Sequence, residues 1–459
     1  MREEFTPKPK LRGPGLPLLY LTLACAHCCS ANTVSFRNYV AYPTGSWPEA
    51  VAIADLNGDG RNDVVMSTSF YSNTNDNSIL IFFQNAAGGL NAPVRYSVGA
   101  NANSLAIADY NGDGHKDIAV AKRGAGIRVF WNDGSGGFNN FTDYTTGNSY
   151  WICAGDFNND GRSDLAGISW SSGLVDVFTQ TTNGTLALAA HYSASYDGYN
   201  DLKAGDVNGD GLADIVVMNG QGQGYPNVSV LLQTNGGFAP AIPFALGGNQ
   251  LTSGVGIGDV TGDGNNNVVV CYGGNRPASM LSVLNQSSGA LSVGATYASY
   301  DIPEGIAVAD LDMDGHLDAV TLHGGWQQAG VYLQNSSGAF DAERLFALPY
   351  ASSYNPHGLA VGDVNGDGRP DIVIADYNHG LVVLYNATTP PPLRISQIKI
   401  NPRGQAMLTL PYLGPHGSNI IESSDSLNNW TPIGTNSDTT WTDTSASSAP
   451  HRFYRVRAQ

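Results

Sequence analysis

The chain has 459 residues, of which 13% are charged, 10% are aromatic and 56 are glycine. This composition is too apolar for a disordered protein and too rich in glycine for a helical bundle, so it favours an all-β fold. The formal net charge of −17 excludes a broad nucleic-acid surface, because phosphate binding needs an excess of Lys and Arg. An acidic protein of this kind more often holds cations.

Residues 1–31 have the pattern of a signal peptide. An apolar stretch over residues 16–26 is too short to span a bilayer but suits the central region of such a peptide. It is preceded by four basic residues, Arg2, Lys8, Lys10 and Arg12. Small-residue cleavage patterns lie at residues 24–26 and 29–31, and the choice between them is left open. With cleavage after residue 31, we expect a mature protein that begins near residue 32, is secreted or held at the cell surface, and has no transmembrane segment.

One ten-residue motif recurs seven times, at intervals of about 50 residues. The copies are ADLNGDGRND from Ala54, ADYNGDGHKD from Ala108, GDFNNDGRSD from Gly155, GDVNGDGLAD from Gly205, GDVTGDGNNN from Gly258, ADLDMDGHLD from Ala309 and GDVNGDGRPD from Gly362. Short apolar runs typical of β-strands flank each copy. Four short strands per period are typical of a propeller blade, with the acidic loop joining its first and second strands.

The seventh period lacks a fourth strand, because the apolar run at residues 381–385 leads to prolines at 390–392. A segment of the missing type, residues 36–42, precedes the first motif. We therefore predict a seven-bladed β-propeller over residues 32–388 whose last blade is completed by this N-terminal strand. Such closure would leave no free sheet edge at the seam.

A Pro-rich linker at residues 389–393 and a small all-β, sandwich-like module at 394–459 follow the predicted propeller. Removal of residues 1–31 would leave Cys153 and Cys271 as the cysteines of the mature chain. They fall in the third and fifth blades, which are not neighbours. We expect both thiols to be free.

The acidic loops carry side-chain oxygens at positions 1, 3, 5 and 9, counted from the first Asp, and glycine at position 6. Alternate side chains of a turning backbone point inward, and glycine permits the positive φ of a sharp bend. Oxygen donors without His or Cys select calcium over transition metals. An EF-hand would instead need Glu at position 12 and flanking helices. Asx-rich turns without an ion are the alternative, but the clustered carboxylates would repel one another by about 4 kcal/mol per close pair at a dielectric constant of about 20.

The motif and its spacing resemble the FG-GAP/VCBS repeat family, the calcium-loop β-propellers that include the heads of integrin α chains and many secreted bacterial proteins. The resemblance covers residues 33–388 and implies up to seven calcium ions, one per blade. The fifth loop departs from the pattern, with Thr261 at position 3 and Asn267 at position 9, so its occupancy is left open. The calcium ligands that the resemblance implies are Asp55, Asn57, Asp59 and Asp63; Asp109, Asn111, Asp113 and Asp117; Asp156, Asn158, Asp160 and Asp164; Asp206, Asn208, Asp210 and Asp214; Asp259 and Asp263; Asp310, Asp312, Asp314 and Asp318; and Asp363, Asn365, Asp367 and Asp371.

Aromatic residues gather in the loops that a propeller places at the end opposite the acidic loops. These loops hold four of the chain's seven tryptophans, whereas the loops on the acidic side hold none. Exposed aromatic rings beside polar groups favour sugar or protein ligands, although any single ring can instead pack between blades. The ligand contacts that we expect are Trp47, Trp151, Trp170, Trp326 and Tyr354.

The sequence thus predicts a monomeric binding or adhesion protein whose partner is a glycan or an extracellular protein. No catalytic residue is assigned, because neither a Gly-x-Ser-x-Gly nor a His-Glu-x-x-His motif is present. The alternative is a carbohydrate-active enzyme, because some polysaccharide lyases use related calcium propellers. Its candidate residues, in the loops opposite the acidic ones, are His323, His357, Arg276 and Tyr354.

Overall fold

A computed structural model describes the chain over residues 33–69, 76–145, 149–169, 173–194, 199–219, 227–246, 252–349, 355–389, 395, 397–401, 405–410, 419–424, 431–436, 440–443 and 453–458. The protein divides into a larger unit, Asn32–Pro391, and a smaller unit that begins at Pro392. Its regular structure is almost entirely β-strand, which confirms the all-β prediction. Within the described ranges, no helix has the length and apolar character that a membrane crossing requires.

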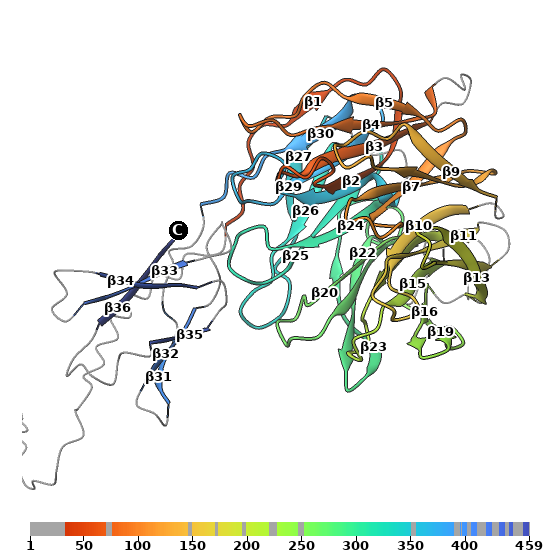
Figure 1. Cartoon of the computed structure of the whole chain (residues 1–459). Helices are drawn as coiled ribbons and strands as arrows, with labels where there is room; N and C mark the ends of the chain where they lie inside the picture. The colour runs from red at the N-terminus through yellow and green to blue at the C-terminus, as the bar shows by residue number, and fades with distance from the viewer. Residues whose placement is uncertain are drawn as a thin grey trace, which may run out of the picture. The chain divides into compact units, whose positions relative to one another are not determined.

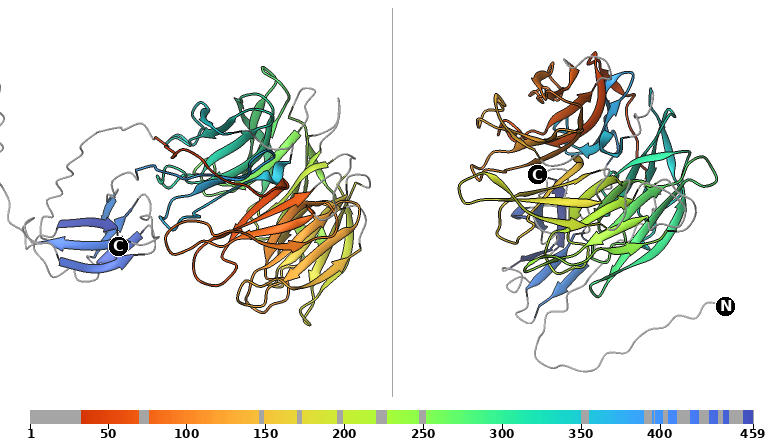
Figure 2. Two further views of the ribbon diagram at one scale, coloured as in Figure 1. Left: turned by 90° about the horizontal axis from the view of Figure 1, so that it is seen from above. Right: turned by 90° about the vertical axis from the view of Figure 1, so that its right-hand side faces the viewer.

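In its described residues, the larger unit contains seven four-stranded antiparallel sheets, drawn in Figures 1 and 2. Six of them use strands in chain order: β2 (Trp47–Ala54), β3 (Asp63–Ser69), β4 (Ser78–Phe82) and β5 (Val94–Ser97); β6 (Ala102–Ala108), β7 (Asp117–Lys122), β8 (Gly126–Trp131) and β9 (Asn140–Tyr144); β10 (Ser149–Gly155), β11 (Asp164–Ser169), β12 (Leu174–Gln180) and β13 (Leu186–Ser193); β14 (Tyr199–Gly205), β15 (Asp214–Asn219), β16 (Val228–Leu231) and β19 (Ile242–Phe244); β20 (Thr252–Gly258), β21 (Asn267–Tyr272), β22 (Met280–Ser287) and β23 (Ala290–Ala298); and β24 (Pro303–Ala309), β25 (Asp318–His323), β26 (Gln328–Tyr332) and β27 (Arg344–Ala347). A small ribbon of β17 (Gln233–Thr234) and β18 (Gly237–Phe238) lies between β16 and β19.

The seventh sheet combines strands from both ends of the larger unit. Its order is β1 (Val40–Tyr42), β30 (Gly380–Leu384), β29 (Asp371–Asp376) and β28 (Leu359–Gly362). Val40 pairs with Val383, and an isolated bridge joins Phe36 to Asn386. The N-terminal strand β1 and the blue strand β30 lie side by side in Figure 1. The segment that the sequence analysis assigned to the missing fourth strand therefore pairs with β30.

Apolar side chains pack consecutive sheets against one another. The second strand of each sheet, such as β3 or β7, is buried along its whole length because both of its faces are covered. One apolar cluster joins Val65 of the first sheet to Val120 of the second, and another joins Val64 of the first sheet to Val373 of the seventh. The first strands β2, β6, β10, β14, β20, β24 and β28 contact one another in succession, and β28 contacts β2. Cys153 and Cys271 are buried and free, as predicted.

The smaller unit consists, in its described residues, of two three-stranded sheets. Leu408, Leu410 and Ile421 form its buried core, with Trp441 packed against them. The Tyr454 hydroxyl donates a hydrogen bond to Asp443 Oδ2 at 2.9 Å. The strands are β31 (Gln397–Ile400), β32 (Ala406–Thr409) and β35 (Thr440–Asp443) in one sheet, and β34 (Thr431–Asn436), β33 (Asn419–Ser424) and β36 (Phe453–Ala458) in the other.

Candidate functional site

The acidic loops all follow the first strand of a sheet, so they lie at one end of the larger unit. Position 6 has a positive φ in all seven loops, as predicted; it is +80° at Gly60, for example. Position 4 also has a positive φ in all seven, which the sequence analysis missed. Glycine occupies position 4 in five of the seven motifs, and this was the available signal. The exceptions are Asn159, with φ +58°, and Met313, with φ +60°.

Replacing Gly60 by Ala tests the left-handed backbone of the first loop. A β-carbon at Gly60 would meet no atom within 4 Å, so the change isolates backbone strain. We expect Gly60→Ala to lower the free energy of unfolding by about 1–2 kcal/mol, because a β-carbon crowds the carbonyl in this conformation. The control is Gly236→Ala, at an exposed glycine that also has open space but does not lie in the left-handed region. Equal urea midpoints for the two variants would contradict the interpretation.

The first aspartate of each loop closes the turn. In the first loop, Asp55 Oδ1 accepts the N–H of Gly58 at 2.8 Å and that of Asp59 at 3.2 Å, while its Oδ2 accepts the N–H of Gly60 at 2.8 Å. The loops that begin at Asp109 and Asp259 repeat these three contacts. Oδ1 accepts two of these bonds, whereas Oδ2 accepts one and keeps a second lone pair. The turn is therefore built by hydrogen bonds that still leave acceptor capacity for a cation.

The ninth residue of the loop is buried beneath it. Asp63 is fully buried, and its two oxygens accept the N–H groups of Leu56 at 3.0 Å and Gln84 at 2.9 Å. Burial raises the pKa of Asp63 to about 6, because the charged carboxylate loses hydration. In the fifth loop the neutral amide of Asn267 takes this place and accepts the N–H of Val260 at 3.0 Å. That loop therefore offers less negative charge to a cation.

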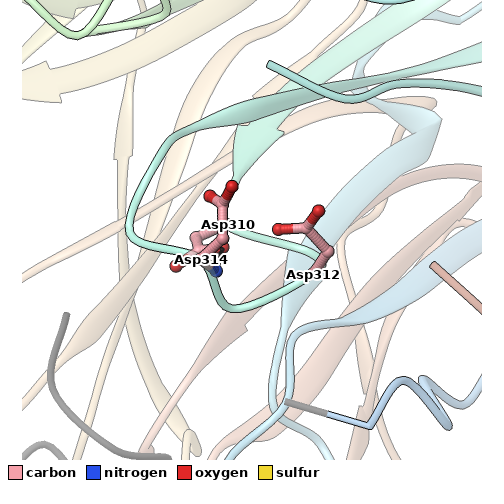
Figure 3. Close-up of side chains that lie close together, drawn as sticks. All are labelled: Asp310, Asp312 and Asp314. Atoms are coloured by element: carbon pink, nitrogen blue, oxygen red, sulfur yellow. Dashed lines mark hydrogen bonds between the residues drawn. The ribbon is translucent and has the colours of Figure 1, made fainter. Parts of the chain in front are cut away.

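The sixth loop, between β24 and β25, has the densest carboxylate cluster (Figure 3). One oxygen each from Asp310, Asp312 and Asp314 lie within 4.8 Å of one another. Asp312 is 3% exposed, and neither of its oxygens has a hydrogen-bond partner among the described residues. Burial, together with the charges of Asp314 and Asp310, raises the pKa of Asp312 to about 7. Burial and the charge of Asp312 raise the pKa of Asp318 to about 8.

These observations test whether the sixth loop fits a cation. A buried carboxylate without partners costs free energy, and a cation within the cluster would remove that cost. All four donors are carboxylates, Asp310, Asp312, Asp314 and Asp318, which suits a hard divalent ion. The residues present fit calcium. In three other loops an arginine at position 7 pairs with the aspartate at position 5, and these pairs are Arg61 with Asp59, Arg162 with Asp160, and Arg369 with Asp367.

The predicted ligand contacts lie in different surroundings at the opposite end. Trp326 is 41% exposed, whereas Trp47 is half-buried. Trp151 is 6% exposed, so the expectation of an exposed ring there is wrong. The pairing register of β10 shifts between Ser149 and Trp151, as at a β-bulge. A bulge changes the direction of the neighbouring side chains, and here the ring of Trp151 is buried. Trp170 and Tyr354 lie outside the described residues.

A pocket of about 460 Å³ opens at the seam between the seventh and first sheets. The rings of Trp47 and Tyr377 line it, with their centroids 4.6 Å apart. His379 also lines it and its Nδ1 is 2.9 Å from Asp376 Oδ1. The volume falls in the range of small-molecule sites. The remaining lining residues are Ala41, Pro43, Thr44, Gly45, Ser46, Asn378 and Gly380.

A second aromatic group lies where the fifth and sixth sheets meet. The ring of Trp326 stands edge-on to Tyr300, at 5.9 Å and 82°. The Arg276 guanidinium lies 3.9 Å from the centroid of the Tyr300 ring. The Tyr300 N–H donates to Glu343 Oε2 at 2.6 Å, and His323 Nε2 is 2.8 Å from Glu343 Oε1. The partly buried carboxylate of Glu343 therefore holds this exposed group in place.

A buried network in the middle of this end was not found from the sequence. The 3₁₀ turn η2 (Pro356–Gly358) contacts β2, β14, β20, β24 and β29. His357 Nδ1 is 3.1 Å from Ser104 Oγ, and His357 Nε2 is 2.7 Å from Asp201 Oδ1. Trp151 stacks on His357 at 5.4 Å. Nothing in the local sequence marks Ser104, and the one available signal for Asp201 is that it is an acid outside the loops.

The connectivity of Ser104, His357 and Asp201 resembles a catalytic triad, but its surroundings do not suit catalysis. Ser104 is fully buried, and its Oγ accepts the N–H of Ile152 at 3.2 Å. A nucleophile must be reachable by substrate, and this one is not. His323 is fully buried as well, so neither of these histidines is placed to act as the base of a lyase.

Comparison with family models decides the family. The FG-GAP-like repeat model matches residues 109–167, 156–217, 206–270 and 310–374, and the FG-GAP repeat model matches residues 47–82. Together these matches contain all seven acidic loops. The chain belongs to the FG-GAP repeat family. No curated protein matches it by sequence.

Solved structures are similar to this FG-GAP repeat protein, and those with a TM-score above 0.5 share its fold. The BP39L lectin from Burkholderia pseudomallei is 16% identical, with a TM-score of 0.57 over 73% of this chain and 95% of the lectin. BBS1N, in complex with ARL6DN, is 11% identical, with a TM-score of 0.54 over 78% of this chain and 98% of that one. A lectin of Agrocybe aegerita that recognises non-reducing terminal N-acetylglucosamine is 20% identical, with a TM-score of 0.48 over 68% of this chain and 82% of the lectin.

The buried His357 gives this FG-GAP repeat protein a predictable response to pH. Burial and the charge of Lys203 lower the pKa of His357. The unfolded chain takes up that proton near pH 6.5 and the folded protein does not, so this contribution to stability is lost as the pH falls. Between pH 6.5 and 5.5 we therefore expect calcium-saturated protein to lose stability through His357, which urea unfolding at the two pH values would measure.

The variant His357→Gln should lose less stability over the same pH range. Burial alone would raise the pKa of Asp201, but the charge of Lys203, which wild type and variant both keep, lowers it. Burial raises the pKa of Glu49, so this residue adds stability as the pH falls. The effect is the same in wild type and variant. The difference between wild type and variant in urea unfolding therefore isolates His357. Parallel pH profiles would contradict the assignment.

Proposed function

We propose that this FG-GAP repeat protein is a calcium-stabilised binding module that takes a glycan at the end of its sheets opposite the acidic loops. The observation that carries the proposal is the seam pocket of about 460 Å³, where the rings of Trp47 and Tyr377 stand beside hydroxyl, amide and imidazole groups. A sugar ring has an apolar face and a rim of hydroxyls, and it needs this combination of partners. The presence of a lectin, BP39L, among the proteins of similar fold supports the choice of ligand class.

Trp326, Tyr300 and Arg276 provide a second contact area at the same end. An exposed tryptophan ring braced by Tyr300 can stack on a sugar, and the exposed Arg276 can donate hydrogen bonds to hydroxyl or carboxylate groups. A chain with several sugar units could contact the pocket and this area together. Multivalent contact of this kind raises the apparent affinity without new chemistry.

Calcium would act on the fold and not as a bridge to the ligand, because the loops that would hold it lie at the other end of the sheets. The bound ion would offset the carboxylate repulsion within each loop and fix the turn. The sixth loop would hold it through Asp310, Asp312, Asp314 and Asp318. We also propose that residues 1–31 direct export, because their apolar stretch follows four basic residues as in a signal peptide. Calcium modules outside the cell commonly bind the ion at about 10⁻⁴ to 10⁻³ M.

A glycan array probed with the protein in millimolar calcium tests the ligand class. We expect binding to a restricted set of sugars, reduced by Trp47→Ala and by Trp326→Ala. The matched control is Trp131→Ala, because Trp131 is a half-buried tryptophan at the end of β8 on the acidic side. An array without signal, together with capture of an extracellular protein, would replace the glycan by a protein ligand.

The enzyme alternative needs a separate assay. Incubation with uronic-acid polymers would yield unsaturated sugar products if the protein were a lyase. We expect none, because His323 and His357 are buried and paired with carboxylates. Appearance of such products, lost in a variant of Arg276, would overturn the proposal of a module that binds without catalysis.

A further inference from the structure

A buried amide side chain stands at or just after the end of the third strand of every sheet in the larger unit. All seven are at most 6% exposed. Glutamine and asparagine are costly to bury unless their polar atoms are bonded, so a buried amide repeated in every sheet indicates a shared task. The residues are Gln84, Asn132, Gln180, Gln233, Gln286, Gln334 and Asn386.

The backbone of these residues holds the acidic loop of its own sheet. The N–H of Gln180 donates to Asp164 Oδ1 at 2.7 Å, and that of Gln233 donates to Asp214 Oδ1 at 2.8 Å. The same bond forms in every sheet whose loop has aspartate at position 9. Six of the seven amide residues are therefore attached to one carboxylate of the loop beside them, and Gln286 is the exception because Asn267 takes the ninth position of its loop.

The side chains of five of these residues reach the loop of the preceding sheet. Gln180 Nε2 donates to the carbonyl oxygen of Asp109 at 3.2 Å, and Gln286 Nε2 donates to that of Asn208 at 2.6 Å. The acceptors lie within the first three positions of the neighbouring loop. The remaining pairs are Asn132 with Leu56 at 2.8 Å, Gln334 with Asp259 at 3.5 Å, and Asn386 with Leu311 at 2.8 Å.

We propose that these amides couple neighbouring calcium loops, so that a cation in one loop strengthens binding in the next. This inference rests on the proposed calcium binding. A cation that orders the ninth aspartate of one loop also fixes the amide residue whose N–H that aspartate accepts. The side chain of this amide residue then fixes a backbone carbonyl of the preceding loop. The second loop has less freedom left to lose when it binds, which is a positive coupling.

The chain supplies its own control, because two of the seven amides do not make the link. The side-chain amides of Gln84 and Gln233 have no hydrogen-bond partner among the described residues. Gln180 and Gln233 are both 2% exposed, and both stand between loops with a full set of ligands. The side chains of the pair therefore differ in the inter-loop bond, and the contact of Arg162 Nε with the Gln180 carbonyl oxygen is a backbone contact that neither substitution removes.

Calcium binding to the full chain, measured by equilibrium dialysis with radioactive calcium, tests the coupling. We expect Gln180→Leu to weaken binding at about two sites by about fivefold, since coupling of this kind starts near that value. Gln233→Leu should leave the binding curve unchanged. Gln180→Asn should restore it, because Asn132 and Asn386 already make this link.

A second change separates coupling from a local effect on one loop. In a background of Asp113→Asn, which removes a ligand of the second loop, the effect of Gln180→Leu on the third loop should disappear. If it persists, the residue merely positions its own loop and the coupling is refuted. Should Gln180→Leu fail to fold by circular dichroism, Asn132→Leu replaces it with the same expectation for the first and second loops, and Asp59→Asn then supplies the background.

The outcomes distinguish the two levels of the proposal. Wild-type protein that binds no calcium would overturn the proposed function and the coupling with it. Wild-type protein that binds calcium, with identical curves for Gln180→Leu and Gln233→Leu, would overturn the coupling alone.

Discussion

Removal of calcium by a chelator is expected to lower the melting temperature of this FG-GAP repeat protein by roughly 15 °C. A site saturated a hundredfold adds about 2.7 kcal/mol to the free energy of unfolding, and several loops would contribute. Without the ion, the buried carboxylate of Asp312, which has no hydrogen-bond partner among the described residues, carries an uncompensated cost of burial. Added calcium should restore the melting temperature, and magnesium should do so poorly because its small octahedral shell fits such a loop badly. An unchanged melting curve in excess chelator would contradict the account.

Single loop variants make this prediction specific. Asp312→Asn should reduce the calcium-dependent part of the stability by about 2–3 kcal/mol, because it removes a buried ligand of the sixth loop. In the metal-free protein the same change should raise stability, because it removes a buried charge. The control is Asp259→Asn in the fifth loop, where Asn267 replaces the ninth aspartate. This variant should change the calcium-dependent part of the free energy of unfolding only slightly. Equal effects of the two variants would contradict the ranking of the loops.

Deletion of residues 32–42 is the second change with a large expected effect. It removes β1 and so exposes the edge of β30, which then presents unpaired backbone groups to other chains. It also removes the bond between the hydroxyls of Tyr42 and Tyr385, at 2.9 Å, and the packing of Phe36 on Phe346 at 4.9 Å. We expect aggregation or loss of cooperative unfolding, measured by light scattering and thermal melting.

Two controls accompany the deletion. Tyr39→Ala removes a side chain of the same segment that is 42% exposed, and it should leave the melting temperature nearly unchanged. A synthetic peptide of residues 33–42 added to the truncated protein should restore solubility by pairing with β30. A truncated protein that is monomeric and as stable as wild type would refute the role of β1 at the seam.

The regular parts of the fold could be predicted from the sequence because they repeat. Seven copies of one motif at nearly constant spacing indicate seven equivalent structural units, and the flanking apolar runs indicate strands. Glycine at position 6 predicted the left-handed backbone found at Gly60, since glycine adopts it without strain. Family-model matches over the loops confirm the repeat assignment.

The other features depend on contacts between distant residues. The burial of Trp151 arises from a bulge in β10 and from His357, which is more than two hundred residues away in the sequence. Gln180 and the four other amides that bond to the preceding loop join adjacent sheets. The local sequence does not predict which loop each of these side chains contacts. One signal was present and missed, because an asparagine or glutamine ends the third apolar run of every period.

Binding of the best glycan from the array, measured by calorimetry on a set of variants, tests most directly where the ligand sits. Trp47→Ala and Trp326→Ala should each weaken binding by tenfold or more, at about 1.4 kcal/mol per tenfold, with little change in the calcium-dependent melting temperature. Asp59→Asn and Asp367→Asn should lower that melting temperature while the remaining folded protein binds the glycan normally. Loss of binding in Asp59→Asn or Asp367→Asn with the fold intact, and normal binding in both tryptophan variants, would place the ligand on the acidic loops and contradict the account.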